Sequence, residues 1–323
     1  AITIKDLKVT GSVAVLMKDA IKPNLVQTLE GNPVFIHGGP FANIAHGSNS
    51  IIATRLALKC ADYVVTEAGF GSDLGAQKFM DITCRAGEFK PSAVVIVATI
   101  RALKMHGNIP YEELKQENVD ALKLGLINLK QHIQIIKNYG VPLVVSLNRF
   151  VSDTEKEIES VKEFCESENV AFEINESWEK GGKGAANLAR KVVEIVENKN
   201  EYKPLYDINL SIKDKIYAIA TQIYGAKDVI FTDNALAQYE QIEKLGLDKL
   251  NVCIAKTQSS LSDDPKLLGF PKGFTLTVKA LNISSGADFI VVIAGSIMTM
   301  PGLSKDPAAY HIDINQNEIV GLF

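Results

Sequence analysis

Short runs of apolar and β-branched residues alternate with helical patterns through the first 200 residues of this chain. Five such runs, at 33–36, 62–66, 92–99, 141–147 and 170–174, are predicted to be buried strands. Helical spacing at 49–60, 75–84, 118–139, 153–169 and 185–197 predicts the intervening helices. This order is typical of a parallel, doubly wound sheet with right-handed crossovers. We therefore predict an α/β fold whose strands end at one ligand crevice.

A polar stretch at 197–204 breaks this alternation and predicts a domain boundary near residue 200. Residues 1–200 would form the α/β domain, in which 13–29 also has apolar residues at helical spacing. Residues 201–323 would form a smaller α+β domain. Its predicted helices are 211–223 and 234–244, and its predicted strands are 252–255, 274–283 and 289–294.

The composition limits the kinds of molecule that this chain is expected to bind. The hydrophobic fraction of 46% and the charged fraction of 22% are ordinary globular values. A net charge of -4 argues against a nucleic-acid partner, which usually requires a basic stripe. No run reaches the roughly 18 apolar residues of a membrane span, and the four cysteines lack metal or disulfide spacing. We expect a cytoplasmic protein that binds neither nucleic acid nor membranes.

A glycine-rich turn, HGGPFANIAHG at 37–47, follows the first predicted strand. Its glycines let a ligand approach the backbone, while His37, Asn43 and His46 can hydrogen-bond to an anion. The alternative is a tight turn whose histidines face water. The density of polar and glycine residues favours a functional turn.

A second turn, TEAGFGSDLG at 66–75, places Glu67 and Asp73 at the end of the next predicted strand. Carboxylates there can hold Mg²⁺ through water. Asp73 could equally cap the following helix, and the two roles are compatible.

Later strand ends carry further candidates. Arg101 and Lys104 could neutralise phosphate or carboxylate charge, or form a solvated basic turn. Phe150 and Trp178 each follow a predicted strand and could flank a flat heterocycle, although core packing is as plausible. The glycines of EKGGKG at 179–184 could bind an anion through free amides. The sequence contains neither a GxxxxGK motif followed by Ser or Thr nor a GxSxG motif.

These stretches resemble the formate–tetrahydrofolate ligase family over essentially the whole chain. The run IRALKMHG at 100–107 is its most specific part, and 37–47, 66–75, 148–155, 178–184, 256–265 and 298–303 also match. Five positions depart from the family pattern: Asn108 for Gly, Lys183 for Glu, Ser259 for Tyr, Phe270 for Arg, and Ser296 for an acidic residue.

The resemblance implies that MgATP phosphorylates formate to formyl phosphate, whose formyl group passes to N10 of tetrahydrofolate in one-carbon metabolism. It implies catalytic roles for His37, Asn43, His46, Glu67 and Asp73. It places the folate ring between Phe150 and Trp178, with Arg101 and Lys104 as anion contacts. The implied nucleotide and formyl phosphate contacts are Gly38, Gly39, Phe41, Phe70, Gly71, Asn148, Gly181 and Gly182. Mg²⁺ and a monovalent cation are expected with the substrates, and no metal ligand is assigned.

Family members carry their phosphate loop upstream of the matching region. We therefore expect this chain to be the C-terminal part of such a ligase, with an incomplete P-loop NTPase-like domain. It would act as a homo-oligomer, tetrameric as in the family, or with a separate N-terminal half. The isolated chain would then lack ligase activity but retain weak pterin affinity through Phe150 and Trp178. The alternative is a non-catalytic folate-binding or interaction fragment that needs a separate N-terminal half.

Overall fold

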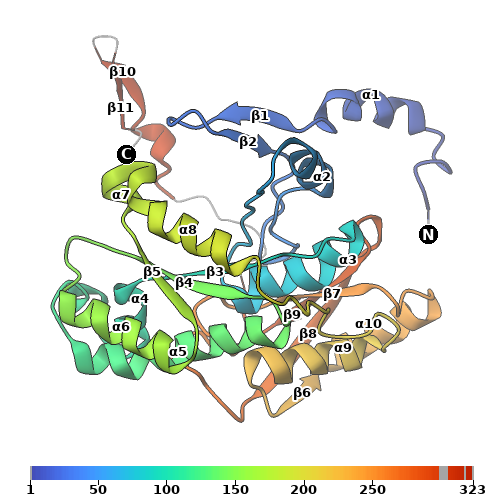
Figure 1. The fold of residues 1–323 in the computed structure, drawn as a ribbon. Helices are drawn as coiled ribbons and strands as arrows, with labels where there is room; N and C mark the ends of the chain where they lie inside the picture. Colours follow the sequence, from blue (N-terminus) through green and yellow to red (C-terminus); the bar gives the residue numbers. More distant parts are fainter. Residues whose placement is uncertain (1, 298–304, 316–317, 322–323) are drawn as a thin grey trace.

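The computed structural model describes residues 2–297, 305–315 and 318–321. At its centre is a three-stranded parallel sheet in the order β3-β4-β5 (Figure 1). Its strands are β3 (Val94–Ala98), β4 (Leu143–Asn148) and β5 (Ala171–Asn175). Three of the five predicted strands and the mixed α/β class with parallel strands are thus confirmed.

Helices lie on both faces of this sheet (Figure 1). The helices α5 (Val119–Asn138) and α6 (Glu155–Ser167) cover one face, and α8 (Ala186–Ile195) lies against β4 and β5 on the other. The long helix α5 buries Leu122, Leu126, Leu129, Ile133 and Ile136, as its apolar spacing predicts. Thr154 and Glu157 form a capping box that begins α6.

The first two predicted strands do not join this sheet, so their prediction as buried strands is wrong. The strand β2 (Pro33–Ile36) instead pairs antiparallel with β1 (Asn24–Gln27) in an exposed hairpin, and 62–66 forms no strand. Val65 is 90% exposed. An apolar run becomes a buried strand only where other elements cover its faces, and sequence spacing does not reveal that cover. The predicted helix at 13–29 is likewise only α1 (Thr10–Ala20), which ends before β1.

The turns and connecting segments contain the remaining short helices. Ser50 caps α2 (Ile51–Cys60) through a hydrogen bond from the amide of Ala53. Two π-helical turns, Ser72–Ala76 and Phe79–Thr83, lead into α3 (Cys84–Gly87) in place of the single predicted helix at 75–84. The other short helices are α4 (Ile100–His106), α7 (Ser177–Lys180) and the turns Tyr111–Glu113, Gly181–Ala185, Ala220–Tyr224, Ser285–Ala287 and Ala308–Tyr310.

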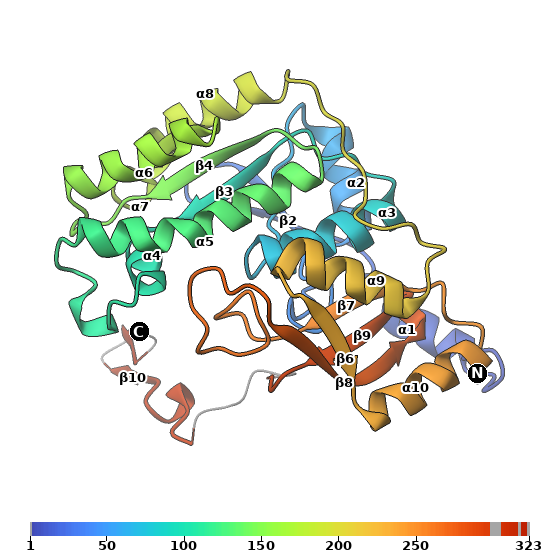
Figure 2. The same cartoon turned by 90° about the horizontal axis from the view of Figure 1, so that it is seen from below.

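A second, mixed sheet has the strand order β6-β8-β9-β7 and packs against α9 and α10 (Figure 2). It comprises β6 (Asp228–Phe231), β7 (Asn251–Ala255), β8 (Thr275–Ser284) and β9 (Phe289–Ala294), with α9 (Ile212–Ile219) and α10 (Asp233–Lys244). The strands at 252–255, 274–283 and 289–294 were predicted, whereas β6 was not. A separate hairpin pairs β10 (Asp313–Asn315) with β11 (Glu318–Val320).

The largest hydrophobic cluster continues across residue 200. Ile135 and Tyr139 of the α5 segment pack in the same cluster as Ile216 of α9 and Leu276 of β8. The division of the chain at residue 200 therefore stays a prediction, and the two parts share a core. In the described part of the chain, no helix is long and apolar enough to cross a membrane.

Candidate functional site

The two glycine-rich turns lie against each other, as the sequence predicts for a shared crevice. The ammonium group of Lys78, which is buried, donates hydrogen bonds to the carbonyl oxygens of Ala42 at 2.7 Å and Asn43 at 2.9 Å. The rings of Phe41 and Phe70 meet edge to face, with centroids 5.9 Å apart. A buried lysine and an aromatic pair thus hold turn 37–47 against turn 66–75.

Glycines let each of the two turns fold tightly. A Cβ atom on Gly75 would lie 1.7 Å from the carbonyl oxygen of Gly69, and one on Gly47 would lie 2.3 Å from the Cβ of Ala42. Gly47 also has a φ of +60°, where a side chain is strained. These two glycines therefore let each turn fold tightly on itself. The two turns meet at Gly69, whose amide donates to the carbonyl oxygen of Gly47 at 3.4 Å.

A cavity of about 670 Å³ opens beside the first turn. Its lining includes Gly38, Gly39 and His46. The Nδ1 atom of His46 lies 3.2 Å from the hydroxyl of Ser48. Burial lowers the pKa of His46 from its ordinary value of 6.5, so its imidazole is neutral near pH 7. The cavity thus combines exposed backbone of a glycine turn with an uncharged imidazole.

His37 is held by both ring nitrogens. Its Nε2 atom lies 2.8 Å from the carbonyl oxygen of Ala20, which can only accept, so Nε2 carries the proton. Its Nδ1 atom then accepts from the hydroxyl of Ser50 at 2.7 Å. In this arrangement His37 anchors the start of α2.

Asp73 is buried and forms an ion pair with Lys256, with 2.7 Å between Oδ2 and Nζ. Lys256 is fully buried and also donates to the carbonyl oxygens of Thr257 and Ser260. Gly71, not Asp73, precedes the first helical turn, so Asp73 does not act as its cap. The negative charge of Asp73 is therefore already balanced within the protein.

His132 and Glu67 differ strongly in their surroundings. Ser72 Oγ lies 2.5 Å from Nδ1 of His132, and burial lowers the pKa of this histidine. Glu67 is exposed and forms no hydrogen bond or ion pair with the rest of the described residues. Glu67 is consequently the carboxylate of this pair of turns that remains free for a ligand.

Sequence reasoning missed Lys78 and His132 altogether and gave Lys256 no partner. Their roles come from contacts with residues more than 30 positions away, so no local motif marks them. The one available signal was a lysine within an otherwise apolar helical pattern. Such a lysine is rarely buried unless it has a partner, so the pattern indicates a polar contact.

A second group of residues lies at the carboxyl ends of β4 and β5. The guanidinium of Arg101 stacks 4.1 Å from the ring centroid of Phe150, whose amide donates to Asp153. Asn175 donates to the side-chain oxygen of Asn148 at 3.0 Å. Phe150 is 36% exposed and Trp178, on α7, is 84% exposed. Both rings present surface to solvent, so core packing does not account for them.

Two predicted anion contacts have partners within the protein. Lys104 is buried in an ion pair with Glu157, 2.8 Å apart, and is therefore not available to a ligand in this arrangement. The amide of Gly182 donates to Oε1 of Glu30 at 2.8 Å, beside Gly181 with its positive φ. The glycine turn after β5 thus binds a carboxylate, here one from the β1–β2 hairpin.

The structure shows the surroundings of four of the five positions predicted to depart from the family pattern. Asn108 has a φ of 67°, the left-handed region that glycine adopts most easily. Phe270 packs with its ring 4.8 Å from the ammonium of Lys272. Ser296 accepts a hydrogen bond from Lys279 and Ser259 donates its amide to Thr257. The matching stretch 298–303 lies outside the described residues.

Within the described ranges, no three His, Cys, Asp or Glu side chains converge in a way that could hold a metal ion. Mg²⁺ bound to a nucleotide needs few protein ligands, because phosphate and water supply the rest.

A glycine turn and exposed aromatic rings at the carboxyl ends of parallel strands are typical of α/β proteins that bind small molecules. A comparison with protein families identifies the family to which this protein belongs. The model of the family described as formate–tetrahydrofolate ligase matches residues 1–323, so the chain belongs to this family. The family consists of ligases of one-carbon metabolism whose substrates include ATP and tetrahydrofolate.

Proposed function

We propose that this chain takes part in the ATP-dependent formylation of tetrahydrofolate through formyl phosphate. A formate oxygen would attack the γ-phosphorus of ATP and release ADP, and N10 of tetrahydrofolate would then attack the formyl carbon and release phosphate. Because an acyl phosphate hydrolyses easily, the site must hold the reactants together and exclude water. The observation that carries the proposal is the packing of the two glycine-rich turns beside the cavity of about 670 Å³.

On the nucleotide side, we assign the phosphate contacts to the first turn. Backbone at Gly38 and Gly39 lines the cavity, and a phosphate oxygen can approach glycine backbone closely. Neutral His46 would hydrogen-bond to the transferred group. Glu67 would hold the Mg²⁺ of MgATP through water, a role supported by its exposure and by the pairing of Asp73 with Lys256.

On the folate side, Phe150 and Trp178 would hold the pterin ring by stacking. Arg101 would keep the Phe150 ring in place, and Asn148 would contact polar edges of the heterocycle. The amides of Gly181 and Gly182 would bind an anionic group of a substrate. The hydrogen bond from the amide of Gly182 to the carboxylate of Glu30 supports this assignment, because the contact is exposed and a substrate anion would displace it.

Trp178 is the only tryptophan, which makes the folate site directly testable. Titration with tetrahydrofolate should quench its fluorescence, and Phe150→Ala should weaken binding by about 1 kcal/mol, roughly fivefold. Tyr111→Ala, another exposed aromatic, should leave affinity unchanged. A flat titration with protein of normal circular dichroism would rule out the aromatic clamp.

A second candidate is that the chain binds folate but requires a phosphate cradle from another segment or polypeptide. The sequence has no phosphate-loop motif, and β3 carries exposed Val95 and Val97. Strands of parallel sheets are normally covered on both faces, and open apolar edges favour a partner. The same candidate includes a homo-oligomer in which another copy of the chain packs against the open edge of β3.

An activity assay separates the two candidates. The 323-residue chain alone, given formate, MgATP and tetrahydrofolate, should form no formyltetrahydrofolate if the cradle lies elsewhere, while tetrahydrofolate still quenches Trp178. Robust turnover by the chain alone would refute the requirement for a further segment.

A further inference from the structure

The strand β5 has an open edge. In the order β3-β4-β5 it is paired on one side only within the described chain. The carbonyl of Asn175 accepts a hydrogen bond from the amide of Arg149 on the β4 side. Because backbone groups alternate sides along a strand, those of Phe172 and Ile174 face away from β4. These residues present free backbone donors and acceptors to a further strand.

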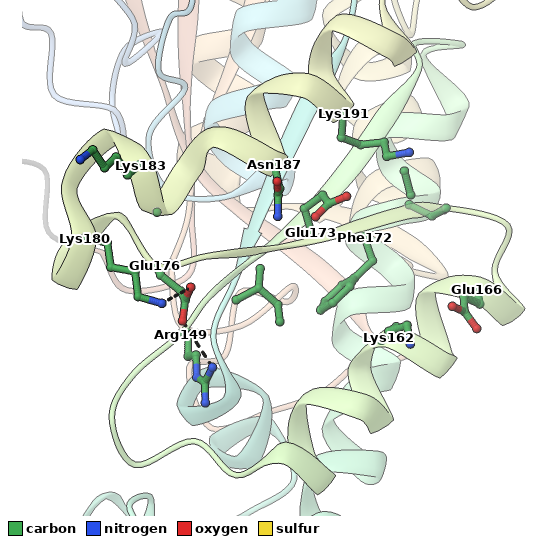
Figure 3. Close-up of a pocket in the computed structure, with 14 residues that line it drawn as sticks. Arg149, Lys162, Glu166, Phe172, Glu173, Glu176, Lys180, Lys183, Asn187 and Lys191 are labelled. Carbon is green, nitrogen blue, oxygen red and sulfur yellow. Dashed lines mark hydrogen bonds and ion pairs between the residues drawn. The ribbon is translucent and has the colours of Figure 1, made fainter.

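The open edge lies at the base of a groove of about 750 Å³ (Figure 3). Lys162 and Glu166 of α6 form one wall, and Asn187 and Lys191 of α8 form the other. Figure 3 shows Phe172 and Glu173 on the strand between these walls. The five residues of β5 span about 17 Å. A short extended segment therefore fits between the two helices.

The charge of the groove is opposite in sign to that of the chain. Its lining has five cationic and three acidic side chains, whereas the whole chain has a net charge of -4. The cationic residues are Arg149, Lys162, Lys180, Lys183 and Lys191. Lys183 forms no ion pair with any described residue. Lys162 and Lys191 form only exposed pairs with glutamates three residues away, which an incoming carboxylate can replace at little cost.

We propose that this groove docks an extended acidic segment of a partner protein, which adds a strand to the sheet at β5. The unpaired backbone groups of Phe172 and Ile174 supply main-chain hydrogen bonds, and the lysines select carboxylate side chains. A polyanion without peptide groups would satisfy the charges but not the strand edge. The proposal does not depend on ligase activity.

The first test uses a fluorescein-labelled peptide of alternating glutamate and valine, Glu-Val-Glu-Val-Glu-Val, in fluorescence anisotropy. We expect saturable binding that weakens by about tenfold in the double variant Lys183→Glu, Lys191→Glu. The matched double variant Lys123→Glu, Lys244→Glu reverses two exposed lysines outside the groove and should change affinity by less than about twofold. Equal weakening by both double variants would overturn the proposal.

Two further probes separate strand addition from simple charge attraction. The same peptide with alternate amides N-methylated keeps its charge and should lose binding, and heparin should not compete in proportion to its charge. Hydrogen exchange of the 170–176 segment should slow when the unmodified peptide binds. Equal binding of the N-methylated peptide, or unchanged exchange at saturation, would overturn strand addition and leave only a basic patch.

Discussion

The buried ion pair between Asp73 and Lys256 gives the sharpest test of how the predicted catalytic turn is held. We expect Lys256→Met to destabilise the protein severely. The substitution leaves a carboxylate that is only 5% exposed without a counter-ion, and it removes the charged donor from the carbonyls of Thr257 and Ser260.

The magnitude follows from the burial of both partners. Removing one member of a buried, hydrogen-bonded pair typically costs about 3–5 kcal/mol, because the remaining charge stays desolvated. A domain is stable by roughly 5–15 kcal/mol in total, so the variant would lose a large part of its stability. Adding Asp73→Asn removes the unpaired charge, so the double variant should be more stable than Lys256→Met alone.

Urea unfolding followed by circular dichroism is the appropriate assay, since Trp178 is too exposed to report on folding. Lys244→Met serves as the control, because Lys244 is exposed and its ion pair with Glu240 spans 3.9 Å. The free energy of unfolding of that variant should fall by less than about 0.5 kcal/mol. The reasoning would be refuted if Lys256→Met lowered the free energy of unfolding by less than about 1 kcal/mol, or if the double variant were no more stable than Lys256→Met.

Two further predictions concern the same pair of turns. Burial lowers the pKa of His132 from 6.5, so the unfolded chain binds a proton that the folded chain does not, and stability is lost as pH falls through 6.5. His132→Gln should therefore reduce the slope of unfolding free energy between about pH 7 and 5 in urea titrations, and an unchanged slope would contradict this. Gly75→Ala would place a Cβ atom 1.7 Å from a backbone oxygen and should lower the free energy of unfolding by about 2 kcal/mol or more. Gly11→Ala should be neutral or stabilising, because Gly11 lies in α1 with open space around it. Similar thermal unfolding of these two glycine variants would contradict the close packing.

Long local patterns allowed much of the fold to be predicted. The 20 residues of α5 carry several turns of apolar spacing, and β4 is a continuous apolar run between helices, so each is identifiable alone. The β1–β2 hairpin was missed although Gly31, with a φ of +83°, and Asn32 provide a turn signal between two apolar runs. Apolar content suggested burial there, but burial depends on which elements cover the faces of the hairpin, and the sequence does not show this.

The two turns were recognisable because their glycines are local in sequence. Glycines after apolar runs mark 37–47 and 66–75, and the structure places the two turns against each other, while their role as a site stays a prediction. What could not be predicted is which polar groups are already satisfied internally. Lys104 looked like a ligand contact because it follows a buried strand in a segment that also carries Arg101 and His106, yet its partner, Glu157, lies 53 positions away. Such pairing depends on tertiary structure and leaves no periodic signal.

The C-terminal part of the chain also helps to hold the turn at 66–75. All the predicted site residues precede residue 183, yet Asp73 is neutralised by Lys256, 183 positions along the chain. The hydrophobic cluster that includes Met80 and Ile135 also includes Ile216 and Leu276. Since the turn at 66–75 depends on a charge from beyond residue 200, the C-terminal part supports the site without supplying a predicted ligand contact. We therefore expect the turn to lose its shape when Lys256 is replaced, even with every predicted site residue intact.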